Sequence, residues 1–488
     1  MGMDSALNSI IERITNTQIW KSIVRHGFPN TPRSQSEVMF WNLFLHIQPE
    51  KAHKNTLRTS YTLGLGLISF YLFLIVTVTG ILLMFFYVPS IERAYRDMKD
   101  LEYVVSYGLF MRNMHRWAAH GMVLAVLLHM ARVFYTGSYK PPREFNWVVG
   151  VVLLVVTLFL SFTGYLLPWD QLAFWAITVG TSIASYAPLL GEKIRFLLLG
   201  GTTIGQSALL RFYVLHVMVL PIAASVLIAL HFWRIRKDGG LSHPNSGEKG
   251  PVDILSVPAN PDKTYGLMEL VEGTSLMVDE EPEDWVQSWP HLIYREFLLF
   301  IGLVILLSAV SIFFNAPLEE LANPDHPPNP AKAPWYFLGL QEMVSYSALV
   351  GGVIVPGIVI IGLMSIPYID SRVEGIGIWF YSKRGRVLAI FSAIITSIIV
   401  PILIYLNTKM GLRTIYPMAP QFLVDILNPA TVLVIIMAVL FFITQKITSS
   451  TREASIALFS SFLMAFTELT IIGTLFRGQN WNWIWPWG

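Results

Sequence analysis

The stretch Arg112–Arg132 reads RNMHRWAAHGMVLAVLLHMAR, and it decides the fold. It is long and apolar enough to cross a bilayer as a helix, yet it carries three histidines. His115 and His129 lie 14 residues apart, which returns them to nearly one face of a helix, about 21 Å apart along its axis. Imidazole inside hydrocarbon is costly unless it has a partner. The stretch therefore predicts a membrane helix with partnered histidines at two depths.

A second apolar stretch, Leu209–Trp233, carries a similar pattern, with His216 and His231 separated by 15 residues. Basic loop residues orient both stretches in the same direction, so the first histidines share one depth and the second histidines another. Two facing imidazoles at each of two depths are typical of a four-helix bundle that holds two haems and passes electrons between them. Satisfied interior histidines and a proton path are the alternative interpretations.

The composition fits a membrane protein and excludes several other classes. Of the 488 residues, 54% are apolar and 14% are charged, and the mean hydropathy is +0.54. A net charge of +2 gives no signal for nucleic acid as a partner. The absence of cysteine excludes disulfides, iron–sulfur ligation and thioether-bound haem in this chain. The N-terminus, with Glu12 and Arg13, lacks the apolar core of a signal peptide.

We expect an all-α, polytopic protein in the lipid bilayer, with about nine transmembrane helices. Positively charged loops after alternate stretches place the N-terminus in the cytoplasm and the C-terminus outside. Trp481–Gly488 is interpreted as an interfacial anchor. The expected spans are Tyr61–Val88, Asn113–Tyr135, Phe145–Leu167, Leu209–Trp233, Glu296–Asn315, Ala348–Ile369, Val387–Asn407, Pro429–Thr448 and Ala454–Leu475.

Five segments follow from these spans. They are an amphipathic cytoplasmic arm (1–60), a four-helix dihaem bundle (61–236), a cytoplasmic linker (237–295), a three-helix C-terminal segment (296–410) and two additional helices with the Trp-rich tail (411–488). The linker contains the acidic run Asp279–Asp284, which is interpreted as a solvated surface.

Glycines on the other two bundle helices repeat the histidine interval. Gly66 and Gly80 lie 14 residues apart, and so do Gly150 and Gly164. Glycine lets a flat ligand approach the backbone closely, although helix packing alone also favours it.

Three further residues flank the histidine pairs. Arg112 and Arg132 each lie three residues from a histidine and suit haem propionates, or else they are helix-end arginines that reach the membrane surface. His120 is out of phase with the pairs and is predicted to have a structural or hydrogen-bonding role.

These stretches resemble the cytochrome b family of cytochrome bc complexes, over about residues 40–410. The LPWDQ run and the 15-residue interval are more similar to the chloroplast-type branch, whose separate smaller subunit the segment 296–410 resembles, here fused. The residues that carry the resemblance are Arg112–Arg132, Thr163–Ala176 (TGYLLPWDQLAFWA), Gly205–His216 (GQSALLRFYVLH) with His231, and Ala333–Tyr336 (APWY).

The resemblance implies that His115 and His216 ligate an outer, low-potential haem. It also implies that His129 and His231 ligate an inner, high-potential haem, and it places Arg211 among the haem-binding residues.

The implied function is quinol oxidation at the outer side and quinone reduction at the inner side, coupled to proton translocation. One electron passes to a Rieske iron–sulfur protein and on to cytochrome c or a similar carrier, within a homodimeric complex of a bacterial-type energy-transducing (inner) membrane. A haem b anchor of a quinone-linked dehydrogenase and a secondary transporter are the alternatives.

The chain departs from the family pattern at two positions. Gly64 stands where the chloroplast-type branch attaches an extra haem through cysteine, so that covalent link is impossible, while a third, noncovalent haem remains compatible. The family's quinol motif is Pro-Glu-Trp-Tyr, whereas this chain has Ala333-Pro334-Trp335-Tyr336, so the carboxylate of the motif is missing. A low-potential quinone such as menaquinone is compatible with this change.

The residues expected at the quinol site are Trp335, Tyr336 and the Pro168–Asp170 turn. Quinol oxidation releases protons and a carboxylate accepts them well, so Glu342 and Asp170 are candidate replacements for the missing group. At the inner side, Arg234, Lys237 and Asp238 either line a quinone-reducing site or follow from positive-inside topology.

Overall fold

The computed structural model describes residues 9, 12–23, 29–42, 45–243 and 285–487. Within these residues, nine helical spans are long and apolar enough to cross a membrane, which confirms the expected all-α polytopic class. They are α5 (Leu65–Met84), α7 (Gly108–Tyr135), α8 (Glu144–Tyr165), α11–η2–α12 (Gln206–Lys237), α13 (Ser288–Phe313), η5–α15 (Val350–Ile369), α16–α17 (Lys383–Ile415), α19 (Pro429–Thr448) and α20 (Thr451–Leu475).

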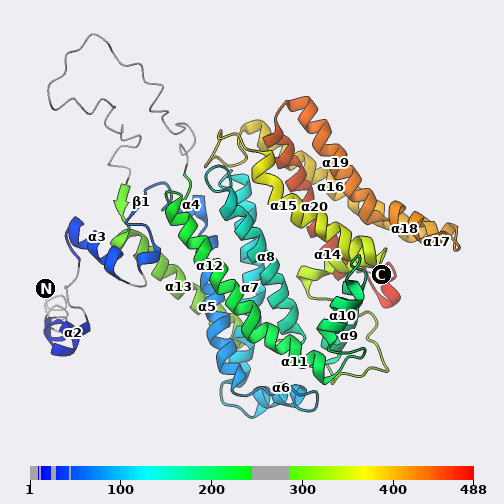
Figure 1. Ribbon diagram of the computed structural model, residues 1–488, viewed down its shortest axis with the longest axis horizontal. Helices are drawn as coiled ribbons and strands as arrows, with labels where there is room; N and C mark the ends of the chain where they lie inside the picture. Colours follow the sequence, from blue (N-terminus) through cyan, green and yellow to red (C-terminus); the bar gives the residue numbers. More distant parts are fainter. Residues whose placement is uncertain (1–8, 10–11, 24–28, 43–44, 244–284, 488) are drawn as a thin grey trace, which may run out of the picture.

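Helices α5, α7, α8 and α12 form a bundle at the centre of the molecule (Figure 1). Helix α5 packs along α7, α8 packs along α12, and α7 also contacts α8. Small residues such as Ala118, Ala125 and Ala224 mix with Leu72 and Leu160 in the shared core. Small residues let membrane helices approach closely, so the histidine and glycine faces are brought together.

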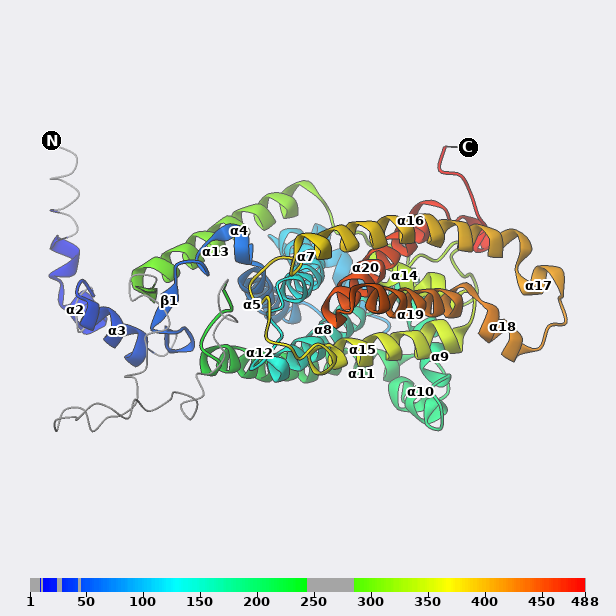
Figure 2. The same ribbon diagram turned by 90° about the horizontal axis from the view of Figure 1, so that it is seen from above.

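The second half of the chain flanks this bundle on two sides (Figure 2). Helix α13 lies against α7, whereas α15 lies against α8, and α20 packs between α16 and α19. A short helix, α14 (Trp335–Val344), packs against α20. The loops hold further short helices that hydropathy does not reveal: α6 (Ala94–Tyr103), α9 (Gln171–Ser185), α10 (Gly191–Leu199) and α18 (Gln421–Leu427).

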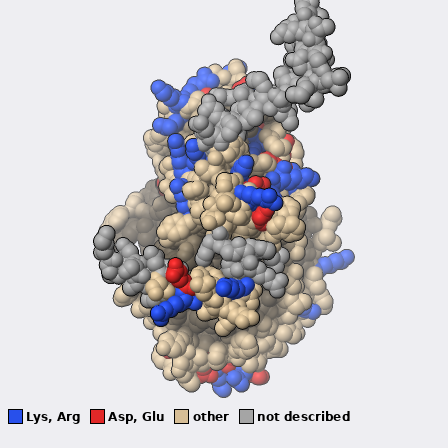
Figure 3. Space-filling model, turned by 90° about the vertical axis from the view of Figure 1, so that its left-hand side faces the viewer, with Lys and Arg blue, Asp and Glu red and all other residues tan. Residues whose placement is uncertain are grey.

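The N-terminal arm contains α2 (Gln18–Ile23), α3 (Pro32–Trp41), η1 (Leu45–Ile47), β1 (Lys51–His53) and α4 (Thr59–Thr62). Helix α3 leaves Phe40 58% and Trp41 81% exposed, as a helix at a membrane surface would. Figure 3 views the molecule from the side of the arm, and most Lys and Arg side chains lie in its upper half. Below them is a zone of uncharged residues, and a second group of charged residues lies at the lower edge. Charged zones on either side of an apolar band are typical of a membrane protein.

The predicted linker ends earlier than expected. Strand β2 (Trp285–Gln287) pairs antiparallel with β1, and α13 begins directly after it at Ser288 rather than near Glu296. The polar start of α13 packs on α3, so tertiary contact extends the helix beyond its apolar stretch. The acidic run Asp279–Asp284 lies outside the residues that the structure describes.

A buried ion cluster joins α20 to the loops of the bundle. Arg452 donates to the hydroxyl of Tyr139 at 2.6 Å, and this hydroxyl donates to Asp370 at 2.5 Å. The ammonium of Lys140 lies 3.2 Å from the other oxygen of Asp370. Burial raises the pKa of Tyr139 and lowers that of Lys140. One carboxylate therefore serves two buried cations, Lys140 at 1% and Arg452 at 4% side-chain exposure.

We expect Asp370→Asn to destabilise the protein by about 3–5 kcal/mol, because it leaves two cations buried without a carboxylate. The thermal unfolding midpoint of the purified protein in detergent measures the effect. Asp325→Asn, at an exposed loop position, is the control. Equal midpoints for the two variants would show that the cluster contributes little stability.

Candidate functional site

The two histidine pairs meet inside the bundle. The ring centres of His115 and His216 are 6.2 Å apart, and those of His129 and His231 are 6.4 Å apart. A metal ion about 2 Å from one nitrogen of each of two imidazoles sets the ring centres about 6 Å apart. Each pair therefore has the separation that a shared iron requires.

Each of these rings lies against a glycine of a neighbouring helix. A Cβ built on Gly164 would lie 2.4 Å from Cε1 of His216, which leaves no room for a side chain. A Cβ on Gly150 would lie 3.9 Å from His231, an ordinary contact. The four juxtapositions are Gly66–His129, Gly80–His115, Gly150–His231 and Gly164–His216.

A π-helical turn explains the unequal histidine intervals. The turn η2 (Leu215–Val219) interrupts α11 (Gln206–Val214) and α12 (Leu220–Lys237) at His216. A π turn holds an additional residue and is frequent at functional sites. The π turn accommodates the additional residue in the 15-residue interval between His216 and His231, so that both histidines project towards the partner rings on α7.

Polar partners orient the rings at the His115 end of the bundle. The hydroxyl of Thr79 lies 3.0 Å from Nδ1 of His115. The hydroxyl of Thr163 and the carbonyl oxygen of Leu160 lie 3.2 and 3.1 Å from Nδ1 of His216. A partner on Nδ1 fixes the ring orientation and leaves Nε2 to coordinate a metal.

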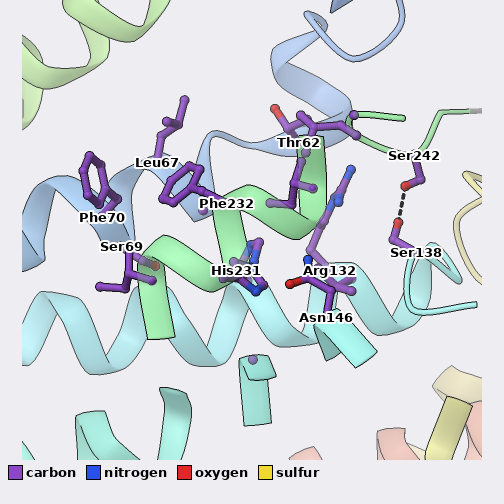
Figure 4. Close-up of a pocket in the computed structure, with 18 of the residues that line it drawn as sticks. Thr62, Leu67, Ser69, Phe70, Arg132, Ser138, Asn146, His231, Phe232 and Ser242 are labelled. Atoms are coloured by element: carbon purple, nitrogen blue, oxygen red, sulfur yellow. Dashed lines mark hydrogen bonds between the residues drawn. The ribbon is translucent and has the colours of Figure 1, made fainter. Parts of the chain in front are cut away.

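A cavity of about 290 Å³ surrounds His129 and His231 (Figure 4). It contains buried polar atoms that have no partner among the described residues: Nη2 of Arg132, Nε of Arg143 and Oδ1 of Asn146. An unpaired buried guanidinium is costly, and a carboxylate is its best partner. Apolar walls with these arginines fit a flat apolar group that carries carboxylates, as a haem does.

The far end of this cavity is lined by residues of the arm and of α13. The amide of Gln48 donates to both oxygens of Glu296, at 3.0 and 3.1 Å. His53 stacks on His243 with ring centres 4.0 Å apart. No motif links these residues in the sequence. Only Glu296 could have been noticed, because it is a carboxylate at the start of an apolar stretch. Gly64 also lines this cavity, in the left-handed backbone region at a φ of +61°.

Arg112 has partners within the protein. Its guanidinium donates to Glu102 at 2.8 Å and to the carbonyl oxygens of Ala316 and Pro317 at 2.9 and 2.8 Å. These bonds tie α7 to the α13–α14 loop, and a contact between Arg112 and a haem propionate stays a prediction. The spacing from His115 could not reveal partners some 200 residues away in the chain.

Arg211 and Arg116 lie at the same end of the bundle. The guanidinium of Arg211, an exposed residue, packs against Gly200 in the turn that precedes α11, and its predicted haem contact stays a prediction. Arg116, which sequence reasoning missed, has a buried Nε without a partner in the described part of the chain. It lies 5.2 Å from the ring of Tyr165, which makes it the better propionate candidate at this end.

Trp335 and Tyr336 begin α14 and contact His120. The indole N–H of Trp335 donates to Nδ1 of His120 at 3.1 Å, and the ring of Tyr336 stands edge-on at 5.6 Å. Because Nδ1 accepts, neutral His120 carries its proton on Nε2, which is buried without a described partner. The hydrogen-bonding role predicted for His120 is present, whereas its place beside the quinol motif was not predicted.

Asp170 acts as the N-cap of α9. One carboxylate oxygen accepts from the N–H of Ala173 at 2.9 Å, and the other accepts from the N–H of Glu319 at 3.2 Å. Burial raises the pKa of Asp170, against the opposing effect of these donors and of Arg116. The carboxylate thus holds the Pro168–Asp170 turn to the α13–α14 loop, and its role as proton acceptor stays a prediction.

Glu342 is an ion-paired carboxylate, and its role as proton acceptor stays a prediction. Its side chain is fully buried and ion-paired with Arg477, whose Nε lies 3.0 Å from Oε2. Trp481 donates to the same oxygen at 2.8 Å, and the Tyr346 hydroxyl donates to the other. The C-terminal tail supplies two of these partners, which local spacing could not show.

A family model described as Cytochrome b/b6/petB matches residues 50–239. Cytochrome b6 of Porphyra purpurea is 44% identical over 175 residues, which is 36% of this chain and 81% of that protein. Cytochrome b6 of Heliomicrobium gestii is 43% identical over 175 residues, 36% of this chain and 82% of that protein.

A solved structure described as "Hyperthermophilic respiratory Complex III" extends the similarity of fold beyond the bundle. It matches with a TM-score of 0.56 at 20% identity, and covers 95% of this chain and 98% of that chain. The residues that match the family model, 50–239, contain the four-helix bundle with its glycines and histidines and the turn at Pro168–Asp170. From this similarity, the chain belongs to the cytochrome b family.

Proposed function

We propose that this chain is the dihaem subunit of a bc-type quinol oxidoreductase, with one haem iron between His115 and His216 and another between His129 and His231. The observation that supports it is the pair of imidazole separations, 6.2 and 6.4 Å, in one bundle with a glycine against every ring. The bound haems would supply one-electron transfer. With two imidazoles to hold each iron, the bound groups would carry electrons rather than bind oxygen.

The direction of transfer follows from the loop charges. Basic residues at the end of α12, beside His231, favour a cytoplasmic position for that end, so the His115 end faces the outer side. Oxidation of a quinol releases two electrons and two protons. One electron passes to a Rieske-type partner and on to a cytochrome c or similar carrier, and the other travels along the bundle. Protons released outside and taken up inside give net translocation.

The chain's residues bind the quinone at both ends. At the outer end, Trp335 fixes His120 so that its Nε2–H can donate to a quinol oxygen, and Tyr336 forms the adjacent wall. At the inner end, Glu296 and His53 line the cavity on the cytoplasmic side of His129, where quinone reduction consumes protons.

We expect His120→Leu to lower kcat/KM for quinol about tenfold, because a hydrogen bond worth about 1.4 kcal/mol is lost. His120→Gln keeps most of the activity, since its amide both accepts from Trp335 and donates to the quinol. Steady-state quinol:cytochrome c activity of the purified complex measures both. Wild-type activity in His120→Leu would remove this residue from the quinol site.

The proposal as a whole is tested on the purified complex. A reduced-minus-oxidised spectrum and the haem-to-protein ratio are expected to show two b-type haems per chain, with a Rieske signal and quinol-dependent reduction of cytochrome c. Haem without the Rieske signal or that activity would indicate a dehydrogenase anchor. Protein made with sufficient haem that shows no b-type bands would indicate a transporter.

A further inference from the structure

The end of α20 and the Trp-rich tail lie along the whole segment that carries Trp335 and Tyr336. Before the motif, Lys332 donates to the carbonyl oxygen of Thr474 at 2.7 Å. Further upstream, the side-chain amide of Asn329 donates to the side-chain oxygen of Asn480 at 2.7 Å, and the N–H of Asn480 donates back at 2.6 Å. The approach to the motif is therefore held by residues near the C-terminus.

Helix α14 itself packs closely on α20 through two glycines. A Cβ on Gly473 of α20 would lie 3.3 Å from Cβ of Leu338, and a Cβ on Gly339 of α14 would lie 3.5 Å from Cβ of Leu469. Glycines on both sides allow the two helices to approach closely. The position of α14 therefore depends on α20.

An ion pair between α14 and the residues that follow α20 adds to this contact. Glu342 is 0% and Arg477 3% exposed at the side chain. Arg477 also donates to the carbonyl oxygen of Trp481 at 3.1 Å, while the indole N–H of Trp481 donates to Glu342 at 2.8 Å. Glu342 and Arg477 are buried and Trp481 is half-buried, and the three residues together link α14 to the tail. Trp481 thus has a partner inside the protein, while the role of the tail as an interfacial anchor stays a prediction.

Helix α14 has little support of its own. It spans ten residues, and its N-cap, Pro334, makes no side-chain capping bond. Because isolated helices of this length are marginal in water, its orientation must come from its neighbours. A change in that orientation moves Trp335 away from His120, 3.1 Å from its indole nitrogen.

We infer that the last helix and the Trp-rich tail are part of the quinol-oxidation site, and that Arg477 is a positioning residue that acts through Glu342 on Trp335 and Tyr336. This inference rests on the proposed function. It gives the additional C-terminal segment a role in catalysis, in place of a role as a membrane anchor alone.

The chain offers a matched control on the same helix. At the opposite end of α20, Arg384 of α16 pairs with Glu453, whose side chain is 2% exposed. This ion pair lies far from Trp335 along α20, about 24 residues or some 36 Å from Arg477. Arg384→Gln therefore tests whether loss of any α20 ion pair impairs the enzyme.

The experiment compares Arg477→Gln, Arg477→Lys and Arg384→Gln in the purified complex. We expect Arg477→Gln to keep both haems and to lower kcat/KM for quinol about tenfold or more, mainly through KM, because displaced binding groups cost such factors. Arg477→Lys recovers part of the loss, and Arg384→Gln is unchanged. Trp481→Phe removes one N–H donor and is expected to raise KM for quinol about threefold. If Arg477→Gln loses haem, the KM of Trp481→Phe tests whether the tail positions the quinol site.

Two results would overturn the inference while the proposed function stands. One is wild-type KM and kcat in Arg477→Gln and Trp481→Phe. The other is an equal loss in Arg384→Gln, which would indicate general destabilisation. A wild-type complex that neither holds two haems nor oxidises quinol would instead overturn the proposed function.

Discussion

His216→Ala removes one haem and leaves the other. The substitution takes away one of two imidazoles at the His115 end, where the partner ring centre lies 6.2 Å away, and leaves the pair at 6.4 Å intact. Extracted haem is expected to fall from about two to about one per chain, with one wave left in a redox titration. Quinol:cytochrome c activity is abolished, because the second electron has no route along the bundle.

The remaining haem is the internal control for folding. His120→Asn is the matched variant, since His120 lies on the same helix but faces Trp335 rather than another histidine. It is expected to retain both haems. If His216→Ala keeps both haems, the ligand assignment is wrong; if it loses both, the two sites are not independent.

Two glycine substitutions of equal chemistry are expected to differ sharply. In Gly164→Ala the added methyl would lie 2.4 Å from Cε1 of His216, so the ring must move and the haem at that end is lost. In Gly150→Ala the methyl would lie 3.9 Å from His231, which is ordinary contact, and both haems remain. Haem extracted per chain, about one against about two, measures the difference.

These variants share a matched design, because Gly164 and Gly150 lie on one helix, on the same face, and each faces one histidine of the α11–η2–α12 span. Equal haem content in the two variants would show that close approach at Gly164 is not needed. Loss of haem in Gly150→Ala but not in Gly164→Ala would show that the close contact is at Gly150 and His231 rather than at Gly164 and His216.

Much of the membrane architecture was predictable, because it depends on local properties of the chain. Long apolar stretches must form helices in a bilayer, since unpaired backbone groups are costly there. The nine predicted spans match the described spans except at their ends, where polar residues such as Ser288–Arg295 continue a helix by packing on neighbours. Helical periodicity also predicted which histidines share a face.

The candidate site was predictable only in part. The intervals of His115 and His129, and of Gly150 and Gly164, indicate one face of a straight helix. The π turn at His216 is not apparent from periodicity. On a straight helix, a 15-residue interval would turn His216 and His231 slightly out of line. The partners of Arg112 and Glu342 could not be predicted, because Ala316 and Arg477 are distant from them in the chain.

The amino-acid order alone thus settles the membrane spans, the two histidine faces and the missing motif carboxylate, because each follows from hydropathy, helical repeat or residue identity. The tertiary structure decides which polar groups form hydrogen bonds or ion pairs within the protein and which stay unpaired and can bind a ligand. Arg132 keeps an unpaired nitrogen in a cavity, whereas Glu342 is enclosed by the tail. The reason is that electrostatic and hydrogen-bond partners are chosen by proximity in space, which sequence separation does not encode.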